Sequence, residues 1–230
     1  MDPSAEQTTY RVAVFDFDGT SIRGQSGALF TEYLILNGAM SLPRALRLIW
    51  WGVRYKLPLP YRQDEARELV LGSLKGRSAS EVDALMVRFH DKVLVPRYRA
   101  QALAEVRRCH DEGLVTLLVS ATFDAIAAAA AKRIGFDGYA ATHMERDDQG
   151  NYTGAVDGPV VAGDEKYRAA AAWCDARLGV GRWELARAYG DHHSDKDLLA
   201  RAETAVAVCP GKTLRLLAKR RGWQILNWNA

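Results

Sequence analysis

The sequence has few cysteines, little net charge and no long apolar run, and each absence removes a class of protein. Its 230 residues include three cysteines, which lie far apart and show no C-x-x-C spacing. Neither a disulfide framework nor a zinc site is indicated, and a reducing cytoplasmic compartment is expected. The excess of 31 basic over 28 acidic residues leaves a net charge of +3. That charge is too small to indicate a nucleic-acid-binding protein.

Membrane-spanning and secretory segments are also not expected. No window of the sequence approaches the roughly 18 consecutive apolar residues that a membrane span requires, and the first nine residues contain no apolar block. A composition with 48% hydrophobic and 26% charged residues is typical of a globular protein. The length allows one large domain, or a core with one sizeable insertion.

Short apolar segments alternate with helical patterns along most of the chain. Residues 11–17, R-V-A-V-F-D-F, predict a strand that is buried on both faces, and similar segments follow at 114–119, 185–189 and 205–208. This alternation predicts an α/β fold, with a Rossmann-like parallel sheet and helices on both faces. Residues 144–154 predict a β-hairpin with its turn at 148–151.

About ninety residues separate the first predicted strand from the second, far more than one crossover helix needs. Four helical patterns in this interval predict an inserted helical bundle. We therefore expect a Rossmann-like core formed by residues 1–22 and 97–230, with a β-hairpin flap at about 143–155. Residues 23–96 are expected to form a helical cap domain.

Three details of the predicted bundle can be compared with a structure. In the first helix, the helical spacing puts Leu29, Tyr33 and Leu36 on one face. The fourth helix is expected to begin at Ser80. In the second helix, which Ser41 can cap, one apolar face is formed by Leu42, Leu46, Ile49 and Val53.

Two carboxylates stand at the carboxyl end of the first predicted strand, in D-F-D-G-T. Open α/β sheets bind ligands at that end. In an extended segment residues i and i+2 point the same way, so Asp16 and Asp18 can face one site. Adjacent carboxylates are unfavourable unless they share a cation or one is protonated. The alternative is a pair that only forms a turn or caps a helix.

A second acidic motif, G-D-H-H-S-D at 190–195, follows another predicted buried strand. The carboxylates of Asp191 and Asp195 suit a hard cation such as Mg²⁺, which prefers oxygen ligands. A zinc or manganese site made from Asp191, His192 and His193 is an alternative, although adjacent histidines usually point in different directions. Either histidine can instead cap the following helix.

Ser120 and Lys166 are weaker candidates when each is considered alone. Ser120 directly follows the predicted strand at 114–119. Its hydroxyl and the backbone N–H groups of a following helix would hold an oxyanion, or the serine would only cap that helix. Lys166 stands at the start of a predicted helix, where most lysines are solvated surface residues.

The four motifs in their order, strand-D-x-D-G-T, strand-S, Lys at a helix start and strand-G-D-x-x-x-D, resemble the haloacid dehalogenase superfamily of phosphohydrolases. The resemblance covers residues 11–19 and then about 99 to the C-terminus. The hairpin M-E-R-D-D-Q-G-N-Y-T-G and the stretch L-L-A-K-R-R-G-W-Q-I-L-N-W look like its phosphoserine-phosphatase-like branch, subfamily IB. The resemblance implies a Mg²⁺-dependent phosphatase that acts on a small phosphorylated metabolite through an aspartyl-phosphate, with the helical insertion as a cap.

The resemblance also implies a role for each motif residue. Asp16 would be the nucleophile and Asp18 the general acid and base. Asp16, the backbone carbonyl of Asp18 and Asp191 would hold Mg²⁺, with Asp195 as a ligand or close neighbour. Ser120 and Lys166 would bind the transferring phosphoryl group. Further phosphate or substrate contacts would come from Gly19, Thr20, Gln25, Arg62, Arg67 and Ala121.

The sequence departs from this branch in the expected cap. Gln25 stands where phosphoserine phosphatases carry a glutamate that matches the substrate ammonium, which puts serine phosphate in question. Arg62 and Arg67 are both candidates for an arginine that binds a substrate carboxylate. His192 replaces a small residue of the last motif and is expected to fill space rather than to contact phosphate.

Two alternatives to a phosphatase of small metabolites stay open. Residues 44–56 combine four basic residues with Trp50 and Trp51, and such a segment could rest on an anionic membrane, which would suit a lipid phosphate. We expect instead that this helix is amphipathic and that its tryptophans pack in the bundle. The other alternative is a non-hydrolytic protein that binds a phosphoryl ligand. The basic run at 219–221 is expected to be a solvated helix end and not a nucleic-acid site.

Overall fold

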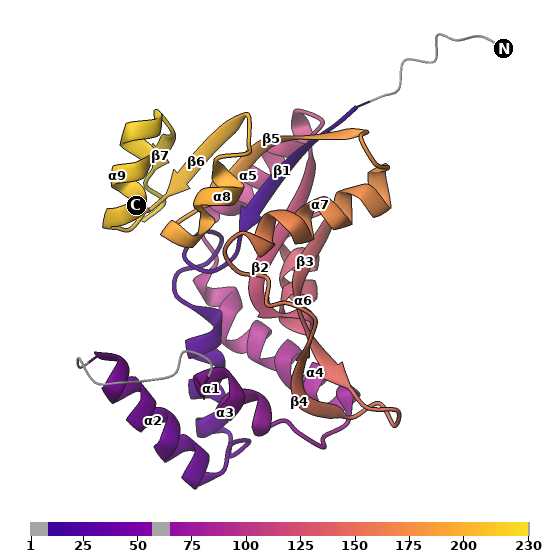
Figure 1. Cartoon of the computed structure of the whole chain (residues 1–230), viewed down its shortest axis with the longest axis vertical. Coiled ribbons are helices and arrows are strands. Elements are labelled where there is room, and N and C mark those ends of the chain that lie inside the picture. Colours follow the sequence, from indigo (N-terminus) through magenta and orange to yellow (C-terminus); the bar gives the residue numbers. More distant parts are fainter. Residues whose placement is uncertain (1–8, 57–64, 230) are drawn as a thin grey trace, which may run out of the picture.

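A computed structural model describes residues 9–56 and 65–229, and its central feature is one sheet of seven strands (Figure 1). The strand order is β4-β3-β2-β1-β5-β6-β7, and all neighbours are parallel except the antiparallel pair β3 and β4. The strands are β1 Tyr10–Asp16, β2 Val115–Phe123, β3 Gly138–Arg146, β4 Tyr152–Asp157, β5 Trp183–Gly190, β6 Thr204–Val208 and β7 Gln224–Leu226.

Helices cover both faces of this sheet, which confirms the predicted α/β class. Figure 1 shows the helices between β1 and α5 gathered beyond one end of the sheet. The helices are α1 Ser26–Leu36, α2 Leu42–Lys56, α3 Glu65–Gly72, α4 Ala79–Phe89, α5 Ala100–Asp111, α6 Asp124–Ile134, α7 Glu165–Leu178, α8 Lys196–Leu199 and α9 Lys212–Arg221. Short helical turns are η1 His90–Leu94, η2 Val95–Arg97 and η3 His193–Asp195.

The central strand β1 separates two hydrophobic clusters, because alternate side chains point to opposite faces of a sheet. Phe15 packs in the cluster with residues of α5 and α6. Val12 and Val14 pack in the cluster with residues of α7, α8 and α9. Burial on both faces explains why β1 is an almost continuous apolar run.

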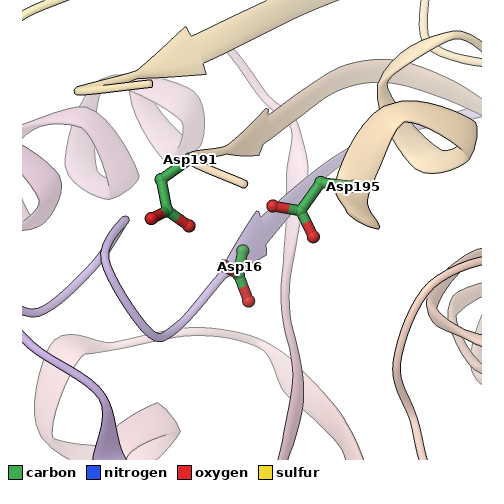
Figure 2. A group of neighbouring side chains, drawn as sticks. All are labelled: Asp16, Asp191 and Asp195. Atoms are coloured by element: carbon green, nitrogen blue, oxygen red, sulfur yellow. The ribbon is translucent and has the colours of Figure 1, made fainter. Parts of the chain in front are cut away.

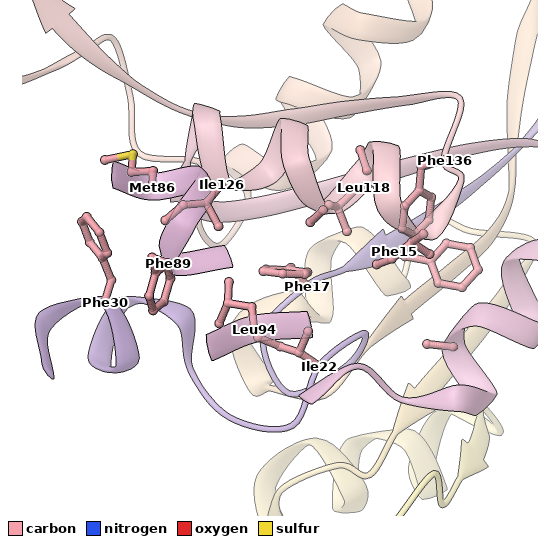
Figure 3. Close-up of a cluster of buried hydrophobic side chains, with 14 of the residues drawn as sticks. Phe15, Phe17, Ile22, Phe30, Met86, Phe89, Leu94, Leu118, Ile126 and Phe136 are labelled. Atoms are coloured by element: carbon pink, nitrogen blue, oxygen red, sulfur yellow. The ribbon is translucent and has the colours of Figure 1, made fainter. Parts of the chain in front are cut away.

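The first of these clusters continues from the sheet into the inserted helices (Figure 3). Phe17 follows β1 directly and is fully buried. Phe30 of α1 lies 5.0 Å from Phe89 of α4 and 6.2 Å from Phe123, ring centroid to centroid. The inserted helices are therefore packed on the sheet beside the carboxyl ends of its strands.

Expectations for three of the inserted helices need correction. In helix α1, Leu29 and Tyr33 pack against the core cluster, but Leu36 of the same predicted face is exposed, and the buried apolar residues are Phe30 and Leu34. Helix α4 begins at Ala79, because Ser78 and not Ser80 is its N-cap and accepts a hydrogen bond from the Glu81 N–H. In α2, the apolar face expected from spacing points to solvent, and its exposed residues are Leu42, Leu46, Ile49, Trp50 and Val53. The expectation that both tryptophans pack in the bundle was therefore wrong for Trp50, whereas Trp51 lines a cavity on the inner side of the helix. Periodicity identifies an apolar face but not the element that covers it.

Two further observations concern the cysteines and the possibility of a membrane-spanning helix. The three cysteines are free thiols, and Cys109 and Cys174 are buried. Within residues 9–56 and 65–229, no helix combines the length and the apolar character that crossing a bilayer requires.

Substitution of Phe15 tests how much the packing around β1 contributes to the stability of the fold. Its ring stacks on Tyr189 at 4.0 Å and meets Phe136 edge-on at 5.3 Å. Phe15→Ala should lower the free energy of unfolding by about 3–5 kcal/mol, because it opens a cavity in a closed core. Urea unfolding followed by circular dichroism measures this. The exposed Leu216 offers a control, since Leu216→Ala should change stability by less than about 0.5 kcal/mol. Equal effects of the two substitutions would contradict the prediction.

Candidate active site

The candidate site lies where the strand order reverses beside β1. After β1 the chain builds β2 and β3 on one side, and it later places β5 on the other side. Asp16 is the last residue of β1, and Asp191 directly follows Gly190, the last residue of β5. Because β1 and β5 are parallel, their carboxyl ends lie at the same edge of the sheet. That edge is the usual ligand-binding position in open α/β folds.

Three carboxylates meet at this edge. Asp16, Asp191 and Asp195 each offer an oxygen within 4.8 Å of the others. Figure 2 shows the three side chains gathered from the ends of β1 and β5 and from the short helical turn after β5. Asp16 and Asp195 are buried and Asp191 is half-buried. The sequence-predicted acidic residues of two distant motifs thus form one cluster.

Lys166 joins this cluster from the first turn of α7. Its Nζ donates hydrogen bonds to Asp16 Oδ1 and to Asp195 Oδ1, both at 2.6 Å. Lys166 is only 5% exposed, unlike most lysines at helix starts. The sequence left a surface position open for this lysine, whereas the structure places it inside the acidic cluster.

Burial and crowding shift the pKa values of the clustered groups. Burial raises the pKa of Asp16 well above its usual value; Lys166 opposes this shift, while the charges of Asp195 and Asp191 add to it. Burial, followed by the charge of Asp195, raises the pKa of Asp191 to about 6. Burial alone would lower the pKa of Lys166, but the carboxylates of Asp16 and Asp195 outweigh it and raise that pKa. Lys166 is therefore charged at neutral pH.

The donor set fits a hard divalent cation. Three carboxylate oxygens close together repel one another unless a cation lies between them, and oxygen ligands are those that Mg²⁺ prefers. In the described part of the chain, this cluster contains no histidine. Nδ1 of His192 instead lies 3.0 Å from Ser194 Oγ and accepts a hydrogen bond from the Ser194 N–H. The side chain of His192 caps η3, which favours the capping alternative over a zinc site.

Two glycines allow the carboxylates to approach the backbone. A Cβ at Gly19 would lie 2.0 Å from Asp191 Oδ2, and the residue has a positive φ of 75° that disfavours other side chains. A Cβ at Gly190 would lie 2.7 Å from Asp195 Oδ2. The cluster can therefore form only with glycine, or with displaced carboxylates, at these positions.

Asp18 has a different environment from Asp16. Its Oδ1 accepts a hydrogen bond of 2.7 Å from the Ser26 N–H, and its Oδ2 accepts one of 2.9 Å from Ser26 Oγ. Burial raises the pKa of Asp18, and the two bonds from Ser26 oppose that shift. The carboxyl group is thus held at the N-terminus of α1, beside a cavity described below.

Ser120 lies inside a strand and not at the strand-to-helix junction that we expected. Strand β2 continues to Phe123, its register with β3 shifts between Ser120 and Phe123, and α6 begins only at Asp124. The serine is buried, and its Oγ accepts a hydrogen bond of 3.1 Å from the Thr122 N–H. The expected contribution of helix N–H groups next to Ser120 was therefore wrong.

A cavity of about 490 Å³ lies between Asp18 and the inserted helices. Four predicted residues line it: Asp18, Gln25, Arg67 and Ala121. Apolar side chains form much of the remaining wall, including Phe30, Leu48, Trp51, Val70, Phe123 and Ile126. Arg62 lies outside the described residues. Gly19 and Thr20 do not line the cavity, and the buried Thr20 Oγ1 has no hydrogen-bond partner in the described part of the chain.

Sequence reasoning missed three residues that hold the site. Ser26 binds Asp18, as described above. Ser21 Oγ donates a hydrogen bond of 2.7 Å to the Asp16 carbonyl. The buried Arg99 donates to the Gly19 carbonyl at 3.1 Å and to the Trp228 carbonyl at 3.0 Å, and so ties the loop after β1 to the C-terminal segment. The two serines follow D-x-D-G-T within six residues and could have been suspected, but nothing in the sequence marks Arg99.

Comparisons with known proteins agree with this geometry. The family model described as haloacid dehalogenase-like hydrolase matches residues 13–200. A phosphoserine phosphatase of Mycobacterium tuberculosis is 29% identical over 217 residues, which are 93% of this chain and 69% of the relative. A histidinol-phosphatase of Neisseria meningitidis is 25% identical over 94% of this chain and 98% of the relative.

The solved structures include one of similar size and architecture. It is a protein of unknown function from Bordetella pertussis, with a TM-score of 0.85 and 29% identity, and the match covers 96% of this chain and all of that one. The family match extends over most of the chain and includes all four sequence motifs. The chain belongs to the haloacid dehalogenase-like hydrolase family and is a phosphatase of that family.

Proposed function

We propose that this phosphatase hydrolyses phosphomonoesters in two steps, through an aspartyl-phosphate on Asp16. The observation that carries the proposal is the meeting of Asp16, Asp191 and Asp195 with Lys166 at the carboxyl ends of β1 and β5. Asp16, Asp191 and Asp195 would hold Mg²⁺, together with the backbone carbonyl of Asp18. When bound, the ion would neutralise the carboxylates and polarise the phosphoryl oxygens.

In the first step, an Asp16 carboxylate oxygen attacks phosphorus and the bond from phosphorus to the ester oxygen breaks. The carboxyl proton of Asp18 passes to the leaving oxygen. The raised pKa of Asp18 supports this role, since burial favours the protonated form that an acid needs. Lys166 offsets negative charge as the phosphoryl group approaches the carboxylates.

In the second step, Asp18 removes a proton from water, and the resulting hydroxide attacks the phosphorus of the aspartyl-phosphate. The bond between phosphorus and the Asp16 oxygen breaks, inorganic phosphate leaves, and both carboxyl groups return to their starting states. Ser26 supports the two roles of Asp18, because its two hydrogen bonds fix the carboxyl orientation throughout.

The inserted helices supply the substrate contacts in this proposal. The cavity beside Asp18 is walled by apolar side chains, and Arg67 is its one basic residue among the described ones. Gln25 is neutral, so Asp18 is the one carboxyl group that lines the cavity there. An ammonium group would find no dedicated partner. The cavity therefore favours a phosphomonoester with an apolar organic portion over serine phosphate.

Asp16→Asn tests the nucleophile. The substitution keeps the size of the side chain but removes the attacking carboxylate, so hydrolysis of p-nitrophenyl phosphate should fall by about a thousandfold or more. Phosphate release with and without Mg²⁺ measures this, and circular dichroism confirms folding. The matched control is Asp111→Asn at the exposed end of α5, which should keep wild-type activity. Substantial turnover by Asp16→Asn would refute the covalent step.

The raised pKa of Asp191 predicts how stability responds to pH and to Mg²⁺. Because this pKa of about 6 exceeds the ordinary value of 3.8, the stabilising effect of the protonated group is full below pH 3.8 and is lost as pH rises through 6. Mg²⁺ binds the deprotonated form and stabilises the fold increasingly over the same range. The rise in melting temperature on adding Mg²⁺ should therefore be small at pH 5 and large at pH 7.5.

Thermal unfolding of the wild type at the two pH values, with Mg²⁺ or with a chelator, checks this. Asp191→Asn should abolish most of the Mg²⁺-dependent rise at pH 7.5. An equal rise at both pH values in the wild type would contradict the assignment of Asp191 to the cation.

Gln25→Glu tests the specificity of the cavity. The new carboxylate would offer a partner for an ammonium group, so the ratio of kcat/KM for phosphoserine to that for phenyl phosphate should rise by about tenfold. The wild type should prefer the apolar ester. A panel of phosphoserine, sugar phosphates, phenyl phosphate and lysophosphatidic acid measures the ranking. A wild-type preference for phosphoserine would overturn the role given to Gln25.

A further inference from the structure

The outer face of α2 is an exposed apolar feature of the described chain that the proposed chemistry does not use. Five large apolar residues of this helix are exposed: Leu42, Leu46, Ile49, Trp50 and Val53. We call this set the α2 stripe. Leu42 is 71% exposed and Trp50 is 55% exposed. At 100° per residue the stripe covers an arc of about 100°, so it is one continuous face and not a scatter of single residues.

The stripe lies on the outward side of α2, and the opposite side of the helix packs against the rest of the protein. Ala45 is buried, Leu48 packs against the core cluster, and α2 lies against α3. Figure 1 shows α2 at the periphery of the molecule, with α1 and α3 on one side of it. A stable helix therefore presents its most apolar side to solvent, an arrangement that marks interaction surfaces.

The charge around the stripe identifies the chemistry of what covers it. From Tyr33 to Gln63 the sequence has no acidic residue and five basic ones, which are Arg44, Arg47, Arg54, Lys56 and Arg62. This segment contributes +5 to a chain whose net charge is +3, so the rest of the chain carries −2. The positive charge of the protein is thus concentrated in the segment that carries the α2 stripe.

The arginines of α2 differ in their contacts and in the side of the helix on which they lie. Arg54 forms an ion pair with Glu65 at 2.6 Å. Arg47 is exposed, forms no ion pair in the described part of the chain, and borders the stripe beyond Trp50 at 100° per residue. Arg44 lies on the opposite side of the helix, with its guanidinium close to Gly72 of α3. A second copy of this chain on the stripe would bring two copies of Arg47 and Arg54 together, which is unfavourable. An anionic surface with an apolar interior satisfies both the stripe and the arginines at its edge.

We propose that the α2 stripe docks on an anionic lipid bilayer, with α2 lying in the plane of the interface. The leucines, Ile49 and Val53 would enter the acyl region, Trp50 would stand at its edge, and Arg47 would reach lipid phosphates. Trp50 lies between the aliphatic residues and Arg47 on the helix surface, the position where an amphipathic ring is stable at an interface. The protein lies on the bilayer and does not cross it.

Co-sedimentation of the full chain with vesicles tests the proposal, in buffer with a chelator so that no divalent ion bridges protein and lipid. Vesicles of phosphatidylcholine alone are compared with an equimolar mixture of phosphatidylcholine and phosphatidylglycerol. Binding to the anionic vesicles should be stronger by about tenfold or more, and it should weaken as salt is added.

Variants separate the apolar from the charged contribution. L46Q/I49Q should lower binding to anionic vesicles by about tenfold or more, because two apolar side chains are lost from the interface. R47Q should lower binding to anionic vesicles and reduce its salt dependence. The matched control is R215Q/L216Q on α9, which alters an exposed arginine and an exposed leucine on another basic helix and should bind as the wild type does.

Fluorescence places the helix at the interface. The chain has six tryptophans, so the signal of Trp50 is obtained as the difference between the wild type and Trp50→Phe. Brominated lipid in anionic vesicles should quench the wild type, and Trp50→Phe should lose most of that quenching. Hydrolysis of p-nitrophenyl phosphate without vesicles should be the same for L46Q/I49Q and the wild type, since neither residue lines the cavity.

The outcomes that overturn the proposal are distinct from failure of the phosphatase mechanism. No binding to anionic vesicles, or equal binding by the wild type and L46Q/I49Q, refutes docking. A dimer in analytical ultracentrifugation that L46Q/I49Q dissociates would show that a second copy covers the stripe instead. Vesicle binding by a protein that hydrolyses no phosphomonoester would refute the proposed mechanism and leave docking intact.

Discussion

The proposed chemistry depends on one buried arrangement, in which the ammonium of Lys166 lies between the carboxylates of Asp16 and Asp195, with Asp191 beside them. Three ionised carboxylates and one ammonium leave two negative charges in a small, poorly solvated space, which is unfavourable without a further cation. A protein that maintains such a site does not gain stability from it. The sheet must therefore be stable on its own account, and the apolar β1 core around Phe15, with its stacked partner Tyr189, provides this stability. The same repulsion would favour the binding of the proposed divalent cation.

The sequence predicted the parts of this site that depend on local pattern. Strands buried on both faces are nearly continuous apolar runs, and the carboxyl ends of parallel strands meet at one edge, so the convergence of Asp16 and Asp191 could be predicted. Arg99 could not, because its role comes from the distant carbonyls of Gly19 and Trp228. The end of β2 was also missed. Ser120 continues into a strand segment with shifted register, and a register shift has no signature in the short stretch A-T-F.

The sequence predicted that the inserted helices exist, but not which side of each helix is buried. Helical spacing in α1 and α2 marked apolar positions, but the spacing is the same whether the face meets a core, a cavity or solvent. In α1, Phe30 and Leu34 are buried in the core, whereas the α2 stripe is exposed to solvent. The reason is geometric: a small insertion attached to one end of a sheet can bury only one side of each helix. The remaining apolar side of α2 is then left for the proposed docking.

The two sides of α2 connect the proposed chemistry with the proposed docking. Leu48 and Trp51 on its inner side line the cavity that reaches Asp18, and the α2 stripe lies on its outer side. A helix with its side chains is about 10–12 Å across, so a docked α2 would hold the cavity within about one helix diameter of the lipid. An apolar ester drawn from the interface would then travel a short path to the phosphate site. An apolar cavity, a neutral Gln25 and an exposed basic amphipathic helix are separate features of the sequence, and a phosphomonoester with an apolar body accounts for all three.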